Sequence, residues 1–328
     1  MTNMPVLPDD VLLEIFHFYK EDPTSTRLYT WCWITLIHVC RRWRHTVFGS
    51  PRLLNLRLVC FERTPARTSL DIWPPLPIII FSNIDQTVDE GCLENVIVAL
   101  EHRQRISSIR ILDCIGGSAL EKSIAAMLEP LPVLTQCSLI SRDNSVSTPV
   151  LPETFLGGSA PHLESFELRG IPFPTFPNFI LSCTQIQHLS LDNISHSGYI
   201  SPDVMATCLA ALPNLTHLFI GFQSPLSRSV EMAPPLLTRT VFPALTHLSF
   251  RGVCEYYFED FIVRIDGPHF FFLAITFFMD GVDDFFDISR FRNIINHTLA
   301  ERVNRASMEF TSQEIKINFA NFTERPHE

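Results

Sequence analysis

Four segments of this chain share one short pattern of apolar residues, and that pattern limits the possible folds more than any other feature. They read PHLESFEL from residue 161, TQIQHLSL from 184, PNLTHLFI from 213 and PALTHLSF from 243. Each holds an apolar residue, two variable residues, an apolar residue, one variable residue and a last apolar residue. With three weaker copies, successive copies lie 23 to 30 residues apart, and their first apolar positions are 106, 134, 163, 186, 215, 245 and 270.

The last two apolar positions of each copy are separated by one residue, so they lie on the same face of an extended strand. We therefore expect seven short parallel strands whose buried side chains form two continuous rows. The first row comprises Ile109, Cys137, Phe166, Leu189, Leu218, Leu248 and Leu273. The second row comprises Ile111, Leu139, Leu168, Leu191, Ile220, Phe250 and Ile275. We assign these side chains to the core and to no chemistry.

The residues between copies are sufficient for a helix that returns the chain to the start of the next strand. Helical spacing of apolar residues predicts such helices over 89–103, 118–128 and 202–212. The chain thus resembles a divergent leucine-rich-repeat solenoid, which implies the α/β class with a parallel sheet. An α/β domain of unrelated strands is the alternative. Residues 306–320 alternate apolar and polar side chains, which predicts a strand pair that closes the last repeat.

Composition and charge limit the classes of partner. Hydrophobic residues make up 46% of the chain and charged residues 18%, which indicates a large buried core. Residues 1–70 hold nine Lys and Arg against six Asp and Glu, whereas the remainder holds 16 against 29. An acidic body repels phosphate backbones, so nucleic acid is not expected as a partner. The most apolar run, FFFLAITFFM at 270–279, is too short to cross a bilayer as a helix, so no membrane partner is expected.

The nine cysteines are scattered and form no CxxC pair. This pattern is typical of reduced, buried thiols, so we expect a cytoplasmic or nuclear protein without disulfides or zinc. Four carboxylates in DGVDDFFD, residues 280–287, lack the alternating oxygen ligands and central glycine of an EF-hand loop and are interpreted as a solvated loop. No metal and no cofactor is therefore expected.

Two amphipathic helices are predicted near the start of the chain. Residues 7–20, LPDDVLLEIFHFYK, have Pro8 in the first turn and an apolar stripe that includes Leu12 and Phe16. A single second helix over about 30–48 places the arginines of VCRRWR on its solvated or partner side. A helical segment this small buries little apolar surface alone, which predicts that it binds another protein.

The same residues resemble an F-box. The family combines a Leu-Pro start, apolar pairs along the first helix, a VC-x-x-W-R segment and a Pro-Leu turn, although the connection between the two helices is longer here than is usual. The resemblance implies binding to the Skp-type adaptor of a cullin ubiquitin ligase. The implied contact residues are Leu7, Pro8, Val11, Leu12, Ile15, Phe16, Val39, Cys40, Trp43 and Arg44.

Three longer segments, LPETFLGGSAPHLESFELRGIPFP, HSGYISPDVM and RIDGPHFFFLAITFF, resemble the F-box proteins with irregular leucine-rich repeats of mushroom-forming fungi. The resemblance implies a substrate-recognition subunit whose F-box binds the adaptor while its repeats bind a protein substrate. The chain has no GxSxG, HExxH or phosphate-binding loop, so we do not expect an enzyme. A repeat scaffold without ligase association, and an enzyme whose site is assembled from loops, are the alternatives.

Three segments are expected along the chain. Residues 1–60 are predicted to be an F-box-like helical domain. Residues 61–103 are predicted to be a connector with a first irregular repeat. Residues 104–328 are predicted to hold the repeats and their C-terminal cap. The first segment is thus expected to bind the ligase and the last to bind the substrate, with the second joining them.

The variable residues beside the core rows face the open side of the predicted sheet and are expected to bind the substrate. They are Arg110, Glu167, Arg169, Asp192, Phe219 and Arg251. Arginines and acids beside an exposed aromatic suit a mixed-charge protein segment. An ordinary solvated face, or recognition through the proline-rich loop 221–241, are the alternatives.

Three histidines, His188, His217 and His247, share the third position of the repeat. Adjacent strands would place them in a row about 5 Å apart. Such a row is interpreted as a metal or pH-sensing site, or more simply as the polar entrance of the strands, since no cysteine or carboxylate recurs beside it.

Overall fold

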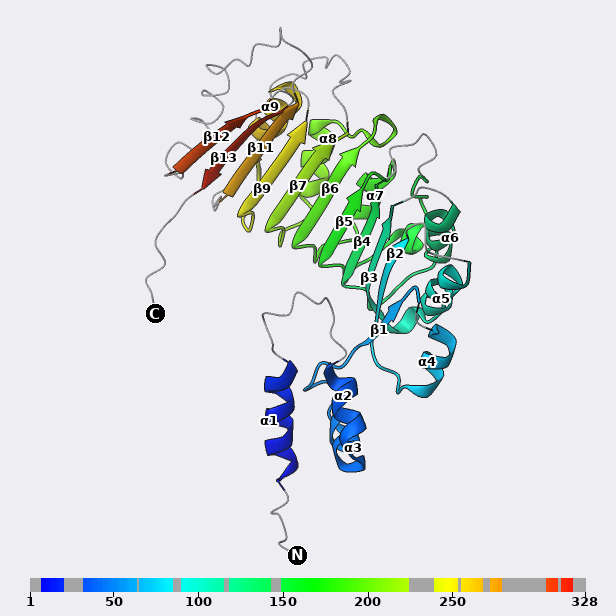
Figure 1. Ribbon diagram of the computed structural model, residues 1–328. Helices are drawn as coiled ribbons and strands as arrows, with labels where there is room; N and C mark the ends of the chain where they lie inside the picture. The colour runs from blue at the N-terminus through cyan, green and yellow to red at the C-terminus, as the bar shows by residue number, and fades with distance from the viewer. Residues whose placement is uncertain are drawn as a thin grey trace, which may run out of the picture.

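The computed structural model describes residues 7–20, 32–63, 65–84, 90–114, 118–142, 149–223, 239–252, 255–267, 272–278, 305–311 and 314–320. The fold is mixed α/β with a large, mostly parallel sheet of eleven strands (Figure 1). The helices are α1 Asp9–Lys20, α2 Cys32–Val39, α3 Arg41–Gly49, α4 Ala66–Ile72, α5 Glu90–Glu101, α6 Ser118–Ala126, α7 Phe176–Ile180, α8 Pro202–Leu209 and α9 Glu255–Arg264. The strands are β1 Leu58–Phe61, β2 Ile78–Ile84, β3 Ile106–Asp113, β4 Gln136–Ser141, β5 Ser165–Arg169, β6 His188–Ile194, β7 His217–Phe222, β8 Thr240–Val241, β9 His247–Gly252, β10 Ile265–Asp266, β11 Phe272–Phe278, β12 Arg305–Phe310 and β13 Glu314–Ala320.

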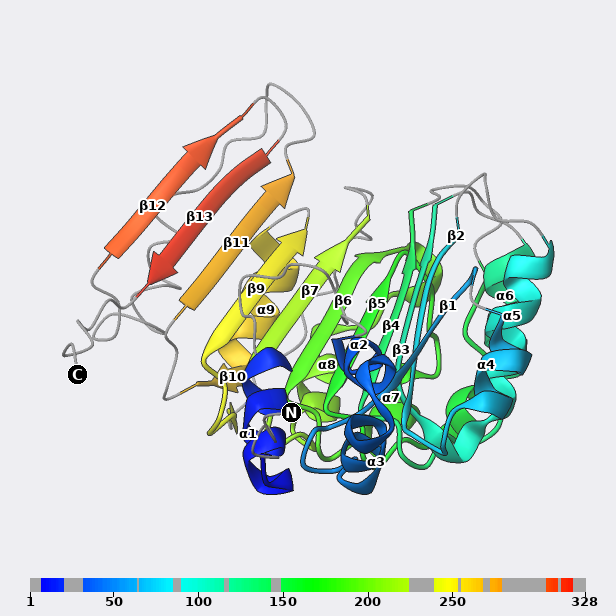
Figure 2. The same cartoon turned by 60° about the horizontal axis from the view of Figure 1, so that its bottom comes forward.

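The large sheet follows the order of the chain along most of its length. Its strand order is β1-β2-β3-β4-β5-β6-β7-β9-β11-β13-β12, and β8 pairs separately with β10. Every pair from β1 to β11 is parallel, whereas β13 is antiparallel to both β11 and β12. The sheet is curved, and helices α5 to α9 lie along one of its faces (Figures 1 and 2). None of the described helices covers the opposite face, which we call the open face.

Both predicted core rows are confirmed. The fourteen side chains are all buried, and each is in register with its counterpart on the neighbouring strand. The first row continues to Ile80 and Cys60 at one end and to Phe319 at the other. The core therefore lies between the sheet and the helices, and alternate residues of every strand are directed to the open face.

The sheet begins before the first strand that the repeat pattern predicts. Strands β1 and β2 pair in parallel ahead of β3. Residues 78–80 are three successive isoleucines, all of them buried. A continuous apolar run of this kind suits a strand that is buried on both faces, but it lacks the spacing of the other copies.

The predicted helices over 89–103, 118–128 and 202–212 are confirmed as α5, α6 and α8, each slightly shorter than expected. The single helix expected over 30–48 is wrong, because the chain breaks at Cys40 into α2 and α3. Cys40 has an extended backbone at φ −159° and ψ 169°, and its Sγ accepts a hydrogen bond from the Trp43 backbone N–H at 3.5 Å. Cys40 is thus the N-cap of a new helix.

Aromatic side chains connect helices α1 to α3 to the beginning of the sheet. The Trp33 ring lies 5.5 Å from Trp73 and 6.0 Å from Phe48, centroid to centroid. The indole N–H of Trp33 donates to the Arg57 carbonyl at 3.0 Å. These contacts place α2 and α3 next to the β1 end of the sheet, and all three helices lie beyond the ends at which the strands begin (Figure 1).

The predicted closing strand pair at 306–320 is also confirmed. β12 and β13 form an antiparallel hairpin, and β13 pairs with β11 along the whole of both strands. Ile315, Ile317 and Phe319 are buried, so they cover the core at the β11 end of the parallel strands. Met308, on the outer strand, is exposed.

Gly170, which directly follows β5, has a backbone conformation that other residues rarely adopt. Its φ is 68°, and a Cβ at this position would lie 2.6 Å from the Ser141 carbonyl oxygen. We expect Gly170→Ala to lower the free energy of unfolding by about 2–3 kcal/mol, because the left-handed backbone and the main-chain contact both oppose a side chain. Gly49→Ala is the control, since no atom lies within 4 Å of its added Cβ. Urea unfolding of both variants measures the difference, and equal midpoints would contradict it.

Candidate functional site

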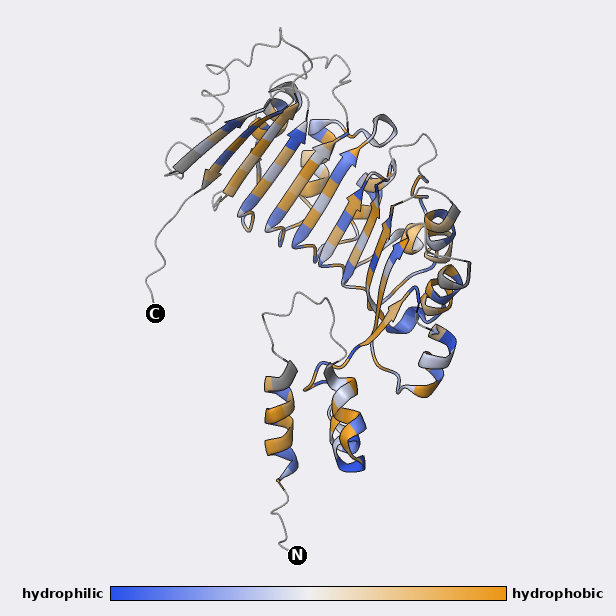
Figure 3. Ribbon diagram, in the orientation of Figure 1, coloured by the Kyte–Doolittle hydropathy of each residue, from blue (hydrophilic) through white to orange (hydrophobic). Residues whose placement is uncertain are grey.

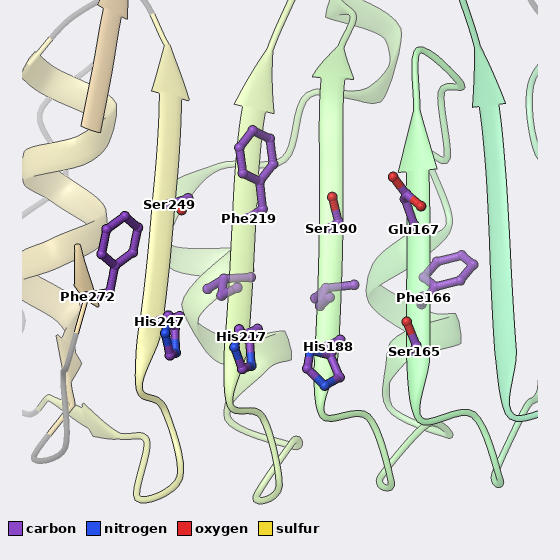
Figure 4. Close-up of a pocket in the computed structure, with 12 residues that line it drawn as sticks. Ser165, Phe166, Glu167, His188, Ser190, His217, Phe219, His247, Ser249 and Phe272 are labelled. Carbon is purple, nitrogen blue, oxygen red and sulfur yellow. The ribbon is translucent and has the colours of Figure 1, made fainter. Parts of the chain in front are cut away.

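Two rows of side chains on the open face come from the third and fifth positions of successive repeats (Figure 4). The register of β5 to β11 aligns Ser165, His188, His217, His247 and Phe272 in the first row. The same register aligns Glu167, Ser190, Phe219, Ser249 and Ala274 in the second row. Residues that are about thirty positions apart in sequence therefore lie side by side.

All members of the two rows except Ala274 line a groove of about 310 Å³. Glu167 is the only Asp, Glu, Lys or Arg among the described residues that line it. The rings of Phe219 and Phe272, with the three histidines, supply flat apolar surface, and serines separate them. This combination of aromatic surface with one charge suits the binding of an extended protein segment.

The three histidines of the groove form a stack. The ring centroids of His188 and His217 are 4.4 Å apart, and those of His217 and His247 are 4.2 Å apart with planes at 10°. The expected row with a spacing of about 5 Å is thus confirmed. The stack continues to Phe272, whose ring centroid lies 5.9 Å from that of His247.

Threonines fix two of these rings at the strand entrance. Thr216 Oγ1 lies 2.9 Å from Nδ1 of His217, and Thr246 Oγ1 lies 2.8 Å from Nδ1 of His247. Each threonine hydroxyl also bonds a carbonyl of the preceding strand, at Gln187 for the first and at Thr216 for the second. The rings are therefore held by the register of the sheet.

Partial burial lowers the pKa of His217 and of His247 below the ordinary value. Repulsion from His247 and His188 lowers the pKa of His217 further, and repulsion from His188 lowers that of His247. The two rings are accordingly uncharged at neutral pH. Metal ions bind imidazole nitrogens in the plane of the ring, whereas these rings are stacked face to face. Among the residues that the structure describes, no group of three His, Cys, Asp or Glu side chains is arranged to hold a metal ion.

This histidine stack makes a prediction about stability and pH. Because the pKa values of His217 and His247 are lowered in the folded state, unfolded chains bind more protons, and the contribution of these two residues to stability is fully present above about pH 6.5. It is lost as the pH falls from there through the lowered pKa values. We expect the melting temperature of the parent to fall more between pH 7.5 and 5.5 than that of His217→Asn, by an amount equivalent to less than about 1 kcal/mol because solvent screens these rings. Equal losses in both proteins would contradict this.

The predicted substrate residues are only partly brought together. Glu167 and Phe219 line the groove. Arg169 lies beside it in an ion pair with Asp192, with 3.2 Å between Nε and Oδ2. On β3, outside the groove, the Arg110 guanidinium lies 5.9 Å from the centre of the Phe81 ring.

Arg251 is engaged in a similar way at the other end of the groove. Its Nη2 donates to Glu314 Oε1 at 2.8 Å, and its guanidinium lies 4.9 Å from the centre of the Phe278 ring. The three histidines and Phe272 are not among the residues that the sequence predicts to bind substrate. Their recurrence at one position of the repeat is the signal that identifies them.

The N-terminal helices have a small core of their own. Leu12 and Phe16 are buried, and the Phe16 ring packs on the edge of Trp43 with centroids 4.9 Å apart. Arg42 joins α3 to the start of α1, because its Nη2 lies 2.6 Å from Asp9 Oδ1 and it also bonds the Leu7 carbonyl. Arg42, expected on a solvated or partner side, is therefore a structural contact.

An apolar face of α1 is left uncovered by the described residues. Val11 is 39% exposed, Ile15 45% and Phe18 73%, with Leu7 exposed just before the helix. Much of α1 has the colour of hydrophobic residues in Figure 3. Val39, at the end of α2, is exposed as well. We call Leu7, Val11, Ile15 and Phe18 the α1 face.

The residues that the F-box resemblance implies for adaptor binding are thus divided. Leu7, Val11, Ile15 and Val39 are exposed, as are Pro8, Cys40 and Arg44. Leu12 and Phe16 are turned into the core of the three helices, with Trp43 half-buried against them, so they hold the unit together. Arg44 also donates from Nε to the Ile37 carbonyl at 3.1 Å, which ties α3 to the end of α2.

Comparison of the chain with models of known protein families and with curated proteins gives no match. No helix in the described ranges has the length and hydropathy needed to cross a bilayer.

The carboxylate segment 280–287 and most of the loop 221–241 lie outside the described residues. The described residues therefore offer two candidate binding surfaces, the groove and the α1 face.

Proposed function

We propose that this chain is a substrate-recognition subunit of a Skp-cullin-F-box ubiquitin ligase and carries no catalytic activity of its own. The observation that supports this most is the α1 face, an apolar surface that the described part of the chain leaves uncovered, on a helix whose residues resemble an F-box. Soluble proteins rarely leave adjacent large apolar side chains exposed without a partner. The proposed partner is the Skp-type adaptor.

The positions of the exposed residues support this division of roles. Leu7, Val11 and Ile15 occupy matching positions of the family pattern and point away from the core, while Leu12 and Phe16 of the same pattern hold the helices together. Burying a Val, Leu or Ile side chain contributes roughly 1.5–3 kcal/mol. Three such side chains supply the apolar centre of an interface.

We further propose that the repeats are a divergent leucine-rich-repeat solenoid that presents the substrate on its open face. Parallel strands spaced 23 to 30 residues apart, two in-register apolar rows and helices along one face all support this. The groove on that face then provides the substrate site, and α1 to α3 bind the ligase from beyond the strand entrances.

Co-elution tests this function directly. The purified chain is mixed with a purified Skp-type adaptor and analysed by size-exclusion chromatography with light scattering. A one-to-one complex is the expected result, and addition of the cullin should enlarge it. Separate elution at micromolar concentrations would contradict the proposal and favour a repeat scaffold without ligase association.

A further inference from the structure

The second row of the groove alternates large and small side chains. Glu167 and Phe219 stand on β5 and β7, and Ser190 stands between them on β6. Two strand spacings separate Glu167 from Phe219, or roughly 10 Å. The small serine leaves the space between carboxylate and ring open, and that space is part of the groove.

The Glu167 carboxylate is held in place at the edge of this space. Ser138, its neighbour on β4, donates from Oγ to Oε2 of Glu167 at 2.6 Å. A hydrogen bond of this kind leaves the charge of the carboxylate in place and fixes its orientation. The other carboxylate oxygen, Oε1, can accept a hydrogen bond from a ligand in the groove.

The electrostatics of the groove favour a cation. Arg169 is paired with Asp192 and Arg251 with Glu314, which offsets their charges near Glu167. Arg110 lies two strands from Glu167, on the side away from Phe219, with its guanidinium 5.9 Å from the centre of the Phe81 ring. The chain from residue 71 onward holds 29 acidic residues against 16 Lys and Arg. Aromatic faces also attract cations when the ion lies within about 6 Å of the ring.

We propose that the groove binds a protein segment through a basic side chain, arginine or lysine, whose cationic group lies between the Glu167 carboxylate and the rings of Phe219 and the histidine stack. That this segment belongs to the substrate rests on the proposed function. Binding of the segment to the groove does not require the adaptor. Arginine fits best, since its planar group bonds a carboxylate and stacks on a ring at the same time.

The histidine stack makes this binding depend on pH. The groups that face it are Ser165 of β5, the hydroxyls of Thr216 and Thr246, Phe272 of β11, and Glu167 in the next row. Uncharged imidazoles tolerate a cation beside them. Protonated imidazoles repel it, so binding weakens as the pH falls, whereas an acidic segment would bind more tightly.

The test uses fluorescein-labelled hexa-arginine, with labelled hexa-glutamate as the comparison, and measures binding to the full chain by fluorescence anisotropy. At pH 7.5 hexa-arginine should bind and hexa-glutamate should not. Glu167→Gln should weaken hexa-arginine binding by about tenfold. The control Glu121→Gln removes the same charge from α6, on the helical face, and should leave binding unchanged.

The pH arm compares pH 7.5 with pH 5.5. The parent should lose at least about threefold in affinity, and a variant with His188→Gln, His217→Gln and His247→Gln should lose less. Tighter binding at pH 5.5, preference for hexa-glutamate, or equal effects of Glu167→Gln and Glu121→Gln would each overturn the inference. Adaptor co-elution without hexa-arginine binding refutes only the groove, whereas hexa-arginine binding without adaptor co-elution refutes only the ligase function.

Discussion

A chain that carries Val11→Glu and Ile15→Lys is expected to lose adaptor binding at least a hundredfold while its fold is kept. Both side chains are exposed on the α1 face, so neither substitution touches the core of the three helices. A buried apolar anchor contributes on the order of 2 kcal/mol to an interface, and each tenfold loss of affinity corresponds to about 1.4 kcal/mol. The Glu and Lys stand four residues apart, an arrangement that supports the helix.

The choice of residues decides whether this experiment is informative. Leu12→Asp would also abolish binding, but Leu12 is 2% exposed, and a charge there would unfold the helices. Leu181→Glu is the matched control, because Leu181 is an exposed apolar residue at the end of α7, which lies apart from α1 (Figure 1). Titration calorimetry measures the affinity, and circular dichroism checks the fold. Retained binding in a folded Val11→Glu, Ile15→Lys chain would remove the F-box proposal.

The sheet could be predicted from the sequence because the spacing of apolar residues in the repeat determines which side chains are buried. Once Leu189, Leu218 and Leu248 occupy the same position of successive copies, parallel pairing aligns them, and a slip by one residue would expose all three. β1 and β2 were not predicted as strands, because an unbroken apolar run carries no such spacing. The break at Cys40 was also not predicted, since cysteine is an unusual N-cap and the apolar spacing continues across it.

The N-terminal helix shows why a stripe on a helix does not identify its buried side. Val11 and Leu12 are adjacent and both apolar, as are Ile15 and Phe16. Apolar residues therefore cover much of the circumference of α1, and only the packing against α2 and α3 separates core from exposed face. The apolar positions of α1 could be predicted from the sequence. Which of them are buried and which are exposed depends on how α2 and α3 pack against the helix.

The open face was predictable in position but not in its ion pairs. Glu167 and Phe219 were placed in one row by register alone. The partner of Arg251 is Glu314, which is 63 residues further along the chain on an antiparallel strand. No local pattern indicates such a pair, so the sequence alone leaves this arginine free to bind substrate.

Removal of residues 303–328 is expected to make the chain aggregate. Strand β13 pairs with β11 from Glu314 to Ala320, and its loss leaves the backbone groups on that edge of β11 unpaired. The buried side chains of Ile315, Ile317 and Phe319 would be lost as well, at roughly 1.5–3 kcal/mol each. That sum approaches the whole stability of a typical domain, about 5–15 kcal/mol.

A shorter truncation and a point substitution separate the possible causes. Removal of residues 321–328 alone keeps both strands of the hairpin and should leave a soluble protein with an unchanged melting temperature. Ile317→Asp keeps the length of the chain but places a charge where the side chain is 1% exposed, so it should aggregate like the long truncation. Light scattering after gel filtration measures each variant. A soluble, cooperatively melting chain without residues 303–328 would show that β11 tolerates a free edge, and the hairpin would then have no role as a cap.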